Sequence, residues 1–156
     1  MGHIKYASDV GAPVEVAFTY TDNHLFVPNW MFGIVSFEPT GELDRGLGAT
    51  FAAAVRLGLW RQTVTCEITE YRRNAVIGYT LRGRLTWTLT LRFDPLGYGR
   101  SALTSETEYS PPRGFAGRLC VGPVDSAAKS ALRRTETQLR REIEEFHVTD
   151  LVGRIA

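Results

Sequence analysis

A long amphipathic helix, predicted from about Val124 to His147, constrains the fold more than any other feature of the sequence. Its apolar residues recur at steps of three and four, and charged residues fill the other positions, so one side of the helix is apolar. The residues on that side are Val124, Ala128, Ala131, Leu132, Thr135, Leu139, Ile143 and Phe146. Such a helix must cover a large apolar surface, which the preceding chain has to supply.

Nearly all of the chain from about residue 32 to residue 109 alternates between apolar and polar residues, which is typical of strands with one buried side. Residues 85–93 show this most clearly. The same pattern predicts strands at about residues 4–10, 32–38, 50–57, 61–71, 76–82 and 101–109. Two short helices follow the first strand, one beginning near Pro13 and one running from about Asp22 to Pro28. The sequence therefore predicts an α+β fold in which about seven antiparallel strands face one helix.

The alternation also predicts which side chains face the helix. A register slip of one residue would exchange the two faces of a strand, so these assignments depend on the register. The predicted inward residues are Phe51, Ala53, Val55 and Leu57; Val64, Cys66 and Ile68; Ile77, Tyr79 and Leu81; Leu85, Trp87, Leu89, Leu91 and Phe93; and Leu103, Ser105, Thr107 and Tyr109. Arg56, Arg82, Glu106 and Glu108 then lie on the outer face.

Composition excludes several classes of protein. The 156 residues are 44% hydrophobic and 22% charged, which suits one globular domain, residues 1–156, with a substantial core. The net charge of +1 is spread without a basic patch, so we expect no nucleic-acid partner. No apolar run approaches the roughly 20 residues of a membrane-spanning helix, and no signal peptide is evident. Two isolated cysteines favour a reducing compartment, so we expect a soluble, cytoplasmic protein without stable membrane insertion.

The common catalytic motifs are missing from the sequence. The three histidines lie far apart without neighbours at ligand spacing, so we predict no metal site. There is no Gly-x-Ser-x-Gly elbow, and the glycine pair at residues 46–48 precedes a strand, which argues against a nucleotide-binding loop. An inward Arg56 or Arg82 could polarise a ligand carbonyl, and His24 near a cavity mouth could act as acid or base. Solvent exposure of all three is the alternative.

The order of the predicted elements resembles the helix-grip fold of the START-like, or SRPBCC, superfamily. The resemblance is carried by Val10 to Phe18, by Asp22 to Trp30, by Gly48 and by Glu67 to Tyr71. Two departures are Phe18, where a tryptophan is frequent, and Ser101, where a threonine is frequent. The resemblance implies that a curved sheet of about seven strands grips a hydrophobic small molecule against the C-terminal helix. It points to the polyketide cyclase/dehydrase-like branch, of which many members only bind or carry ligands.

The candidate site implied by the resemblance lies between the sheet and the helix. Tyr79 and Tyr109 are the candidate catalytic residues, because a buried hydroxyl needs a partner that a ligand oxygen could supply. The candidate ligand-binding residues are Trp30, Phe51, Val55, Trp87, Leu89, Ser105, Thr107, Ala128 and Leu132. Small helix residues opposite aromatic strand residues favour a cavity. The alternative is that the aromatic residues fill the space as core, with Trp30 and Trp60 sealing its edges.

Three functions remain compatible with the sequence. The first is cofactor-free cyclisation, aromatisation or dehydration of a bound polyketide-type intermediate, in which the cavity fixes a reactive conformation and excludes water. The second is a non-catalytic carrier or regulator that binds a lipid, a sterol-like molecule or another metabolite. The third is a partner-binding protein with a filled core. The sequence leaves ligand identity, catalysis and oligomeric state open.

Overall fold

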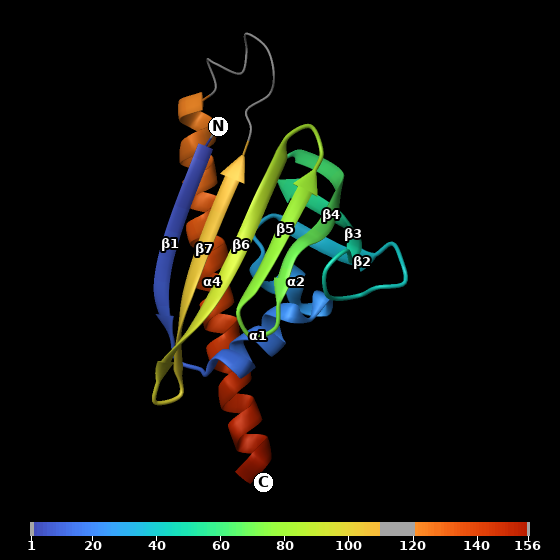
Figure 1. Cartoon of the computed structure of the whole chain (residues 1–156). Helices are drawn as coiled ribbons and strands as arrows, with labels where there is room; N and C mark the ends of the chain where they lie inside the picture. The colour runs from blue at the N-terminus through green and yellow to red at the C-terminus, as the bar shows by residue number, and fades with distance from the viewer. Residues whose placement is uncertain (1, 110–120, 156) are drawn as a thin grey trace.

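The computed structural model describes residues 2–109 and 121–155, and shows one antiparallel sheet curved around a long helix (Figure 1). The seven strands are β1 (Gly2–Val10), β2 (Ile34–Pro39), β3 (Thr50–Leu57), β4 (Trp60–Arg72), β5 (Val76–Arg82), β6 (Thr86–Gly97) and β7 (Arg100–Tyr109). Their order in the sheet is β1-β7-β6-β5-β4-β3-β2. The predicted α+β helix-grip architecture is therefore confirmed.

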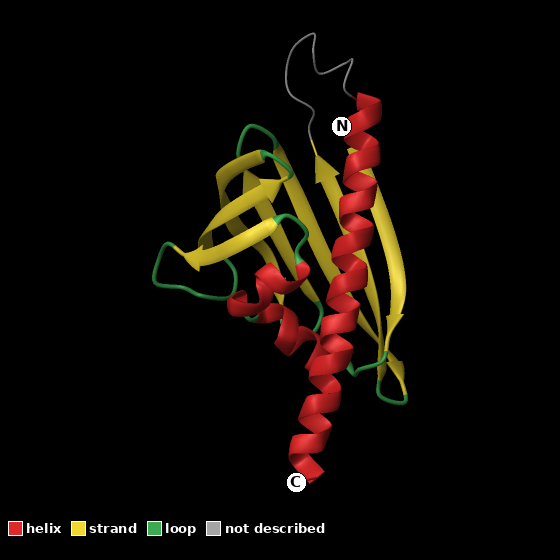
Figure 2. Ribbon diagram, turned by 180° about the vertical axis from the view of Figure 1, so that it is seen from behind, coloured by secondary structure: helices red, strands yellow, loops and turns green. Residues whose placement is uncertain are grey.

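The helices differ from the prediction mainly at their ends. They are α1 (Val14–Asp22), the short 3-10 helix η1 (His24–Phe26), α2 (Val27–Trp30) and α4 (Val121–Ile155). Pro28 was predicted to end the second helix, but it lies in the first turn of α2, where a missing N–H breaks no hydrogen bond. Likewise α4 begins before Pro123 and extends past His147, so that its last turns project beyond the sheet (Figure 2). No helix in the described ranges is both long and apolar enough to cross a bilayer.

The register predicted from the alternation is confirmed. The predicted inward residues of β4, β5 and β7 are all buried, as are Leu89, Leu91 and Phe93 of β6. Glu106 and Glu108 lie on the outer face as predicted, together with Arg56. Strand β5 departs from the simple pattern because Val76–Leu81 are buried on both faces. On the outer side, neighbouring side chains cover β5, including Thr69, which hydrogen-bonds Thr80 at 2.8 Å.

The sheet ends in hairpin turns that point in opposite directions. Gly58, with a φ of +63°, allows the tight turn between β3 and β4. At the other end, Tyr98 has a φ of +54° between two glycines in the turn from β6 to β7. The antiparallel strand order places the β3–β4 and β5–β6 turns at one end of the sheet and the β6–β7 turn at the other (Figure 1).

Helix α4 covers one half of the sheet closely. It packs on β1 and β7 and against α1 and α2, and we name β1, β7 and α1 the clamped half (Figure 2). Carboxylates of α4 accept hydrogen bonds from this half: Ser8 Oγ donates to Glu136 at 3.0 Å, and the Gly11 N–H donates to Glu144 at 2.8 Å. We name β2 to β5 the open half. Side chains of α1, η1 and α2 contact its concave face, whereas α4 packs on β1 and β7.

Candidate functional site

Four aromatic side chains gather on the concave face of the open half. Phe37 stacks on Phe51 with ring centroids 4.3 Å apart, and Tyr79 lies 6.5 Å from Phe37 and 6.2 Å from Trp30. We name these four residues the aromatic cluster. All four are buried, so the structure brings Trp30, Phe51 and Tyr79 of the predicted site together from α2, β3 and β5.

A groove with a volume of about 680 Å³ opens beside this cluster, between α2 and β2 on one side and α4 on the other. We name it the α2–α4 groove. Its lining residues are Pro28, Asn29, Trp30, Met31, Phe32, Gly33, Ile34, Val35, Arg56, Arg133, Arg134, Thr137 and Gln138. Apolar and aromatic residues of α2 and β2 supply one wall, and polar residues of α4 supply the other.

Trp30 connects the groove to the aromatic cluster. Its side chain is 1% exposed, and its indole Nε1 has no acceptor among the described residues. A buried donor left unpaired costs about 1–3 kcal/mol, so a ligand oxygen at this point would be bound favourably. The Ser105 hydroxyl on β7 is likewise buried without a partner in the described ranges. Both residues were predicted to bind ligand, and both present polar atoms with unmet hydrogen-bonding capacity.

The rim of the groove is positively charged. The Arg134 guanidinium lies 5.1 Å from the centroid of the Phe32 ring, and the Arg133 guanidinium lies 5.3 Å from that of Tyr6. Within the described part of the chain, these arginines and Arg56 form no ion pair with a carboxylate. The sequence pattern does not reveal this rim, because the arginines come from α4 and β3, which are far apart in the chain.

The two candidate catalytic tyrosines lie in different rows of the sheet. Tyr79 pairs with Leu89, which pairs with Thr107, so these three form one row across β5, β6 and β7. Tyr109 lies in the next row beside Trp87. The Thr107 hydroxyl donates to the Thr88 carbonyl at 2.6 Å, so its proton is already used within the sheet. Of the other predicted lining residues, Leu89, Ala128 and Leu132 are buried, while Val55 and Trp87 are half-buried.

Burial controls the ionisation of the polar groups near the cluster. It raises the pKa of Tyr79 well above its ordinary value, so this phenol stays protonated and can donate a hydrogen bond but cannot serve as a base. Burial also raises the pKa of the Cys66 thiol to about 12, which leaves it without the thiolate that nucleophilic attack requires. Hydrogen-bond donation is therefore the chemistry that these two inward groups offer.

A half-buried carboxyl group that the sequence pattern does not reveal is hydrogen-bonded to Tyr71. The Tyr71 hydroxyl donates to Asp22 Oδ2 at 2.9 Å, while Asp22 Oδ1 is buried without a partner among the described residues. Burial raises the pKa of Asp22, although the hydrogen bond from Tyr71 opposes the shift. Burial is the main cause of the raised pKa of Tyr79, and the charges of Cys66, Asp22 and Tyr71 add to it. Asp22 is 49 residues away from Tyr71 in the chain, and the packing of α1 against the sheet brings the two together.

A second polar group lies on the outer face of β1 and β7. His3 Nε2 lies 2.5 Å from Glu106 Oε1, and the ligand atoms of His3, Glu106 and Glu108 lie within 4.8 Å of one another. The register places His3 directly opposite Glu108, which sequence spacing alone does not reveal. The group is solvent-accessible, and Lys5 pairs with Glu106 on the same face, which supplies a counter-charge without a metal ion.

Comparison with solved structures supports the fold. TTHA0849 from Thermus thermophilus is 12% identical over 91% of this chain and 97% of that chain, with a TM-score of 0.77. The truncated norcoclaurine synthase from Thalictrum flavum is 14% identical over 91% and 92%, with a TM-score of 0.68. The di-domain ARO/CYC StfQ from the steffimycin biosynthetic pathway is 19% identical over 90% of this chain but 45% of that chain, with a TM-score of 0.69.

Sequence comparison assigns the family. No curated protein sequence matches the chain. The family model described as polyketide cyclase / dehydrase and lipid transport matches residues 1–144, which includes every strand and most of α4. The predicted resemblance is confirmed, and the chain belongs to the polyketide cyclase / dehydrase and lipid transport family of START-like, or SRPBCC, proteins.

Proposed function

We propose that this protein binds a hydrophobic small molecule with at least one oxygen acceptor, in the α2–α4 groove and against the aromatic cluster. Family membership supports hydrophobic-ligand binding in general. The observation that carries the specific proposal is Trp30, a buried residue of the groove lining whose indole N–H lacks an acceptor among the described residues. Ligand pockets are mostly apolar with a few well-placed polar groups, and this groove fits that pattern.

Binding without catalysis is the form of this function that the groove favours. Its lining contains no carboxyl group, histidine, lysine or cysteine, and therefore no acid or base that titrates near neutral pH. Arginines on the rim can hold an oxygen or an anionic group, but they cannot exchange protons under these conditions. A carrier for a lipid, a sterol-like molecule or a polyketide-like metabolite needs no more than this.

Catalysis is the second candidate, and Asp22 is the observation that favours it. Loss of water or ring closure in a polyketide-type intermediate requires one group that removes a proton and one that donates a hydrogen bond to a carbonyl. Asp22 has a raised pKa, and Tyr79, whose pKa is raised by burial, stays protonated as a hydrogen-bond donor. In this reaction Tyr79 would orient the carbonyl and Asp22 would exchange the proton, without a cofactor. Tyr109 would contact the far end of the intermediate.

Native mass spectrometry of the freshly purified protein, followed by denaturation and identification of any released molecule, tests the proposal first. We expect an apolar, oxygen-containing ligand. Its affinity should fall about five- to tenfold in Trp30→Phe, which removes the indole donor, and should stay unchanged in Trp60→Phe at the hairpin tip. A protein that is free of ligand and also fails to bind a panel of aromatic and lipid compounds would contradict the proposal.

Assays for turnover of the identified ligand or of related compounds then distinguish binding without catalysis from catalysis. Tyr79→Phe and Tyr109→Phe should lower affinity or turnover without unfolding the protein, and Asp22→Asn should abolish turnover while ligand is still bound. A double tyrosine variant with full affinity and activity would remove both tyrosines from the site. Binding that persists in every variant without any chemical change would assign the protein to the carriers.

A further inference from the structure

The tip of the β3–β4 hairpin exposes large apolar side chains to solvent. Leu59 is fully exposed at 103%, Trp60 is 44% exposed and Leu57 is 37% exposed. Leu57 and Trp60 are directly paired across the turn, so the three side chains form one apolar tip. Exposed clusters of apolar side chains are unfavourable in water and mark surfaces that contact another molecule.

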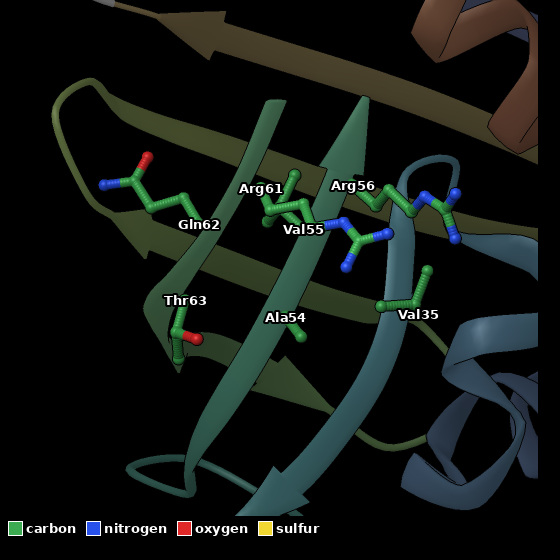
Figure 3. A pocket seen from close by; sticks show the side chains of 7 residues that line it. All are labelled: Val35, Ala54, Val55, Arg56, Arg61, Gln62 and Thr63. Atoms are coloured by element: carbon green, nitrogen blue, oxygen red, sulfur yellow. The ribbon is translucent and has the colours of Figure 1, made fainter. Parts of the chain in front are cut away.

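Two arginines lie directly behind this tip on the outer face of the sheet. Arg56 and Arg61 are opposite each other in the β3–β4 register, where like charges repel. Neither forms an ion pair within the described part of the chain. Their side chains line a hollow of about 450 Å³ together with the exposed Val35 (Figure 3). An anionic group in this hollow would relieve the repulsion between the two guanidinium groups.

The surrounding chain adds positive charge and no negative charge. The β5–β6 turn lies beside β4, since a side chain at Gly83 would contact Val64 and Gln62, and this turn carries the exposed Arg84. Residues 54–66 and 83–86 contain no aspartate or glutamate. This end of the sheet therefore combines exposed apolar side chains at the hairpin tip with arginines behind and beside them.

We propose that the β3–β4 tip docks reversibly on the surface of an anionic lipid bilayer. Leu59 and Trp60 enter the boundary between headgroups and acyl chains, where tryptophan is favoured, and Arg56 and Arg61 bind lipid phosphates. Charge argues against a second copy of the chain as the partner, because two such tips would bring four arginines together. The docking surface shares Arg56 and Val35 with the lining of the α2–α4 groove, but Leu59, Trp60 and Arg61 lie outside that lining, so variants of these three residues test it separately from the ligand-binding proposal.

Co-sedimentation with vesicles tests the docking surface. We expect the protein to bind vesicles of phosphatidylcholine mixed with phosphatidylglycerol, and to bind phosphatidylcholine vesicles much less. Leu59→Glu should weaken binding at least about tenfold, because it places a charge where the exposed leucine would enter the bilayer. Arg56→Gln and Arg61→Gln should each weaken vesicle binding about fivefold. Added salt should also weaken vesicle binding by the unmodified protein.

The opposite end of the sheet supplies a matched control. Tyr98 is 105% exposed at the tip of the β6–β7 hairpin, which also shows Leu96 to solvent but lacks an opposed pair of arginines. Tyr98→Glu adds the same charge at an equally exposed turn, and it should leave vesicle binding unchanged. Equal loss of binding in Tyr98→Glu and Leu59→Glu would overturn the proposal, since a general charge effect would then explain both.

Fluorescence quenching distinguishes insertion from adsorption. Trp60 is the exposed tryptophan, whereas Trp30 is buried and Trp87 in β6 is half-buried. Phospholipids brominated on the acyl chains should quench the emission of the bound protein, and Trp60→Phe should remove most of this quenching. Three results would each overturn the proposal: no preference for anionic vesicles, unquenched emission from Trp60, or a concentration-dependent dimer that Leu59→Glu dissociates.

Discussion

The clamped half and the open half of the sheet are covered by different means. On the clamped half, α4 lies directly on β1 and β7, with Leu139 and Ile143 fully buried and glutamates hydrogen-bonded to the opposing backbone and side chains. On the open half, aromatic rings fill the concave face and a groove lies beside them. The groove lining includes Trp30, whose buried indole N–H is unpaired, and three arginines that form no ion pair among the described residues. The comparison indicates that one half secures the fold and the other is available for binding.

The largest expected effect is the loss of a buried side chain from the clamped half. Leu139→Ala should lower the free energy of unfolding by about 2–5 kcal/mol, because it removes a fully buried side chain and leaves a cavity. Urea denaturation followed by circular dichroism measures the change. Leu151 near the end of α4 is 42% exposed, so Leu151→Ala should change stability by less than about 0.5 kcal/mol. An equal loss of stability in both variants would show that the projecting part of α4 contributes as much to the free energy of unfolding as the part packed on the clamped half.

The next effect concerns the hydrogen bonds that hold α4 in place. Glu144→Ala removes the acceptor of the Gly11 N–H, and should cost about 1–2 kcal/mol. Glu145→Ala, at the exposed neighbouring position, should leave the free energy of unfolding almost unchanged. If the two variants prove equally stable in the same denaturation experiment, packing rather than hydrogen bonding holds α4 on the clamped half.

Sequence patterns predicted the buried faces of the strands and of α4 better than the ends of the helices. The spacing in α4 identified Leu139 and Ile143, and the alternation placed most inward residues correctly, because a strand with one buried side has a fixed period of two. Leu57 is the exception, because it lies at the exposed tip of the β3–β4 hairpin. Helix ends were less predictable, since Pro28 and Pro123 are tolerated in first turns and therefore do not mark a boundary.

The groove could not be predicted in the same way. Alternation indicates which side of a strand a residue occupies, but it does not indicate how the sheet curves or which segments meet. The groove joins residues 28–35 to Arg56 and to residues 133–138 of α4, and the hydrogen bond between Tyr71 and Asp22 depends on how α1 packs against the sheet. Trp30 was identified as a candidate residue, but its unpaired N–H became apparent only with its neighbours in place.

A small effect on stability is expected from the groove rim. Arg134→Gln removes the contact with the Phe32 ring and should lower the free energy of unfolding by about 0.5–1 kcal/mol at most. The same variant should weaken binding of any ligand that carries a carboxylate or carbonyl oxygen. Thermal denaturation and ligand titration measure the two effects separately. A large loss of stability with unchanged affinity would show that Arg134 secures the fold and does not contact ligand.

Removing the charge of Glu136 in α4 should raise the free energy of unfolding, whereas the changes above lower it. Burial raises the pKa of Glu136 above its unfolded value, although the hydrogen bond from Ser8 and the charge of Arg140 oppose the shift. The folded protein then binds this proton more readily than the unfolded chain. Its contribution to stability is therefore present below the unfolded pKa and is lost as the pH rises through the folded pKa.

Glu136→Gln should consequently raise the free energy of unfolding at neutral pH and flatten its decline between acidic and neutral pH. Glutamine keeps an oxygen that accepts from Ser8 but carries no charge to desolvate. Urea denaturation across this pH range, with the exposed Glu145→Gln as the control, measures the effect. A Glu136→Gln variant that is less stable than the unmodified protein at neutral pH would show that attraction to Arg140 outweighs burial, and that α4 is held by charge as well as by packing.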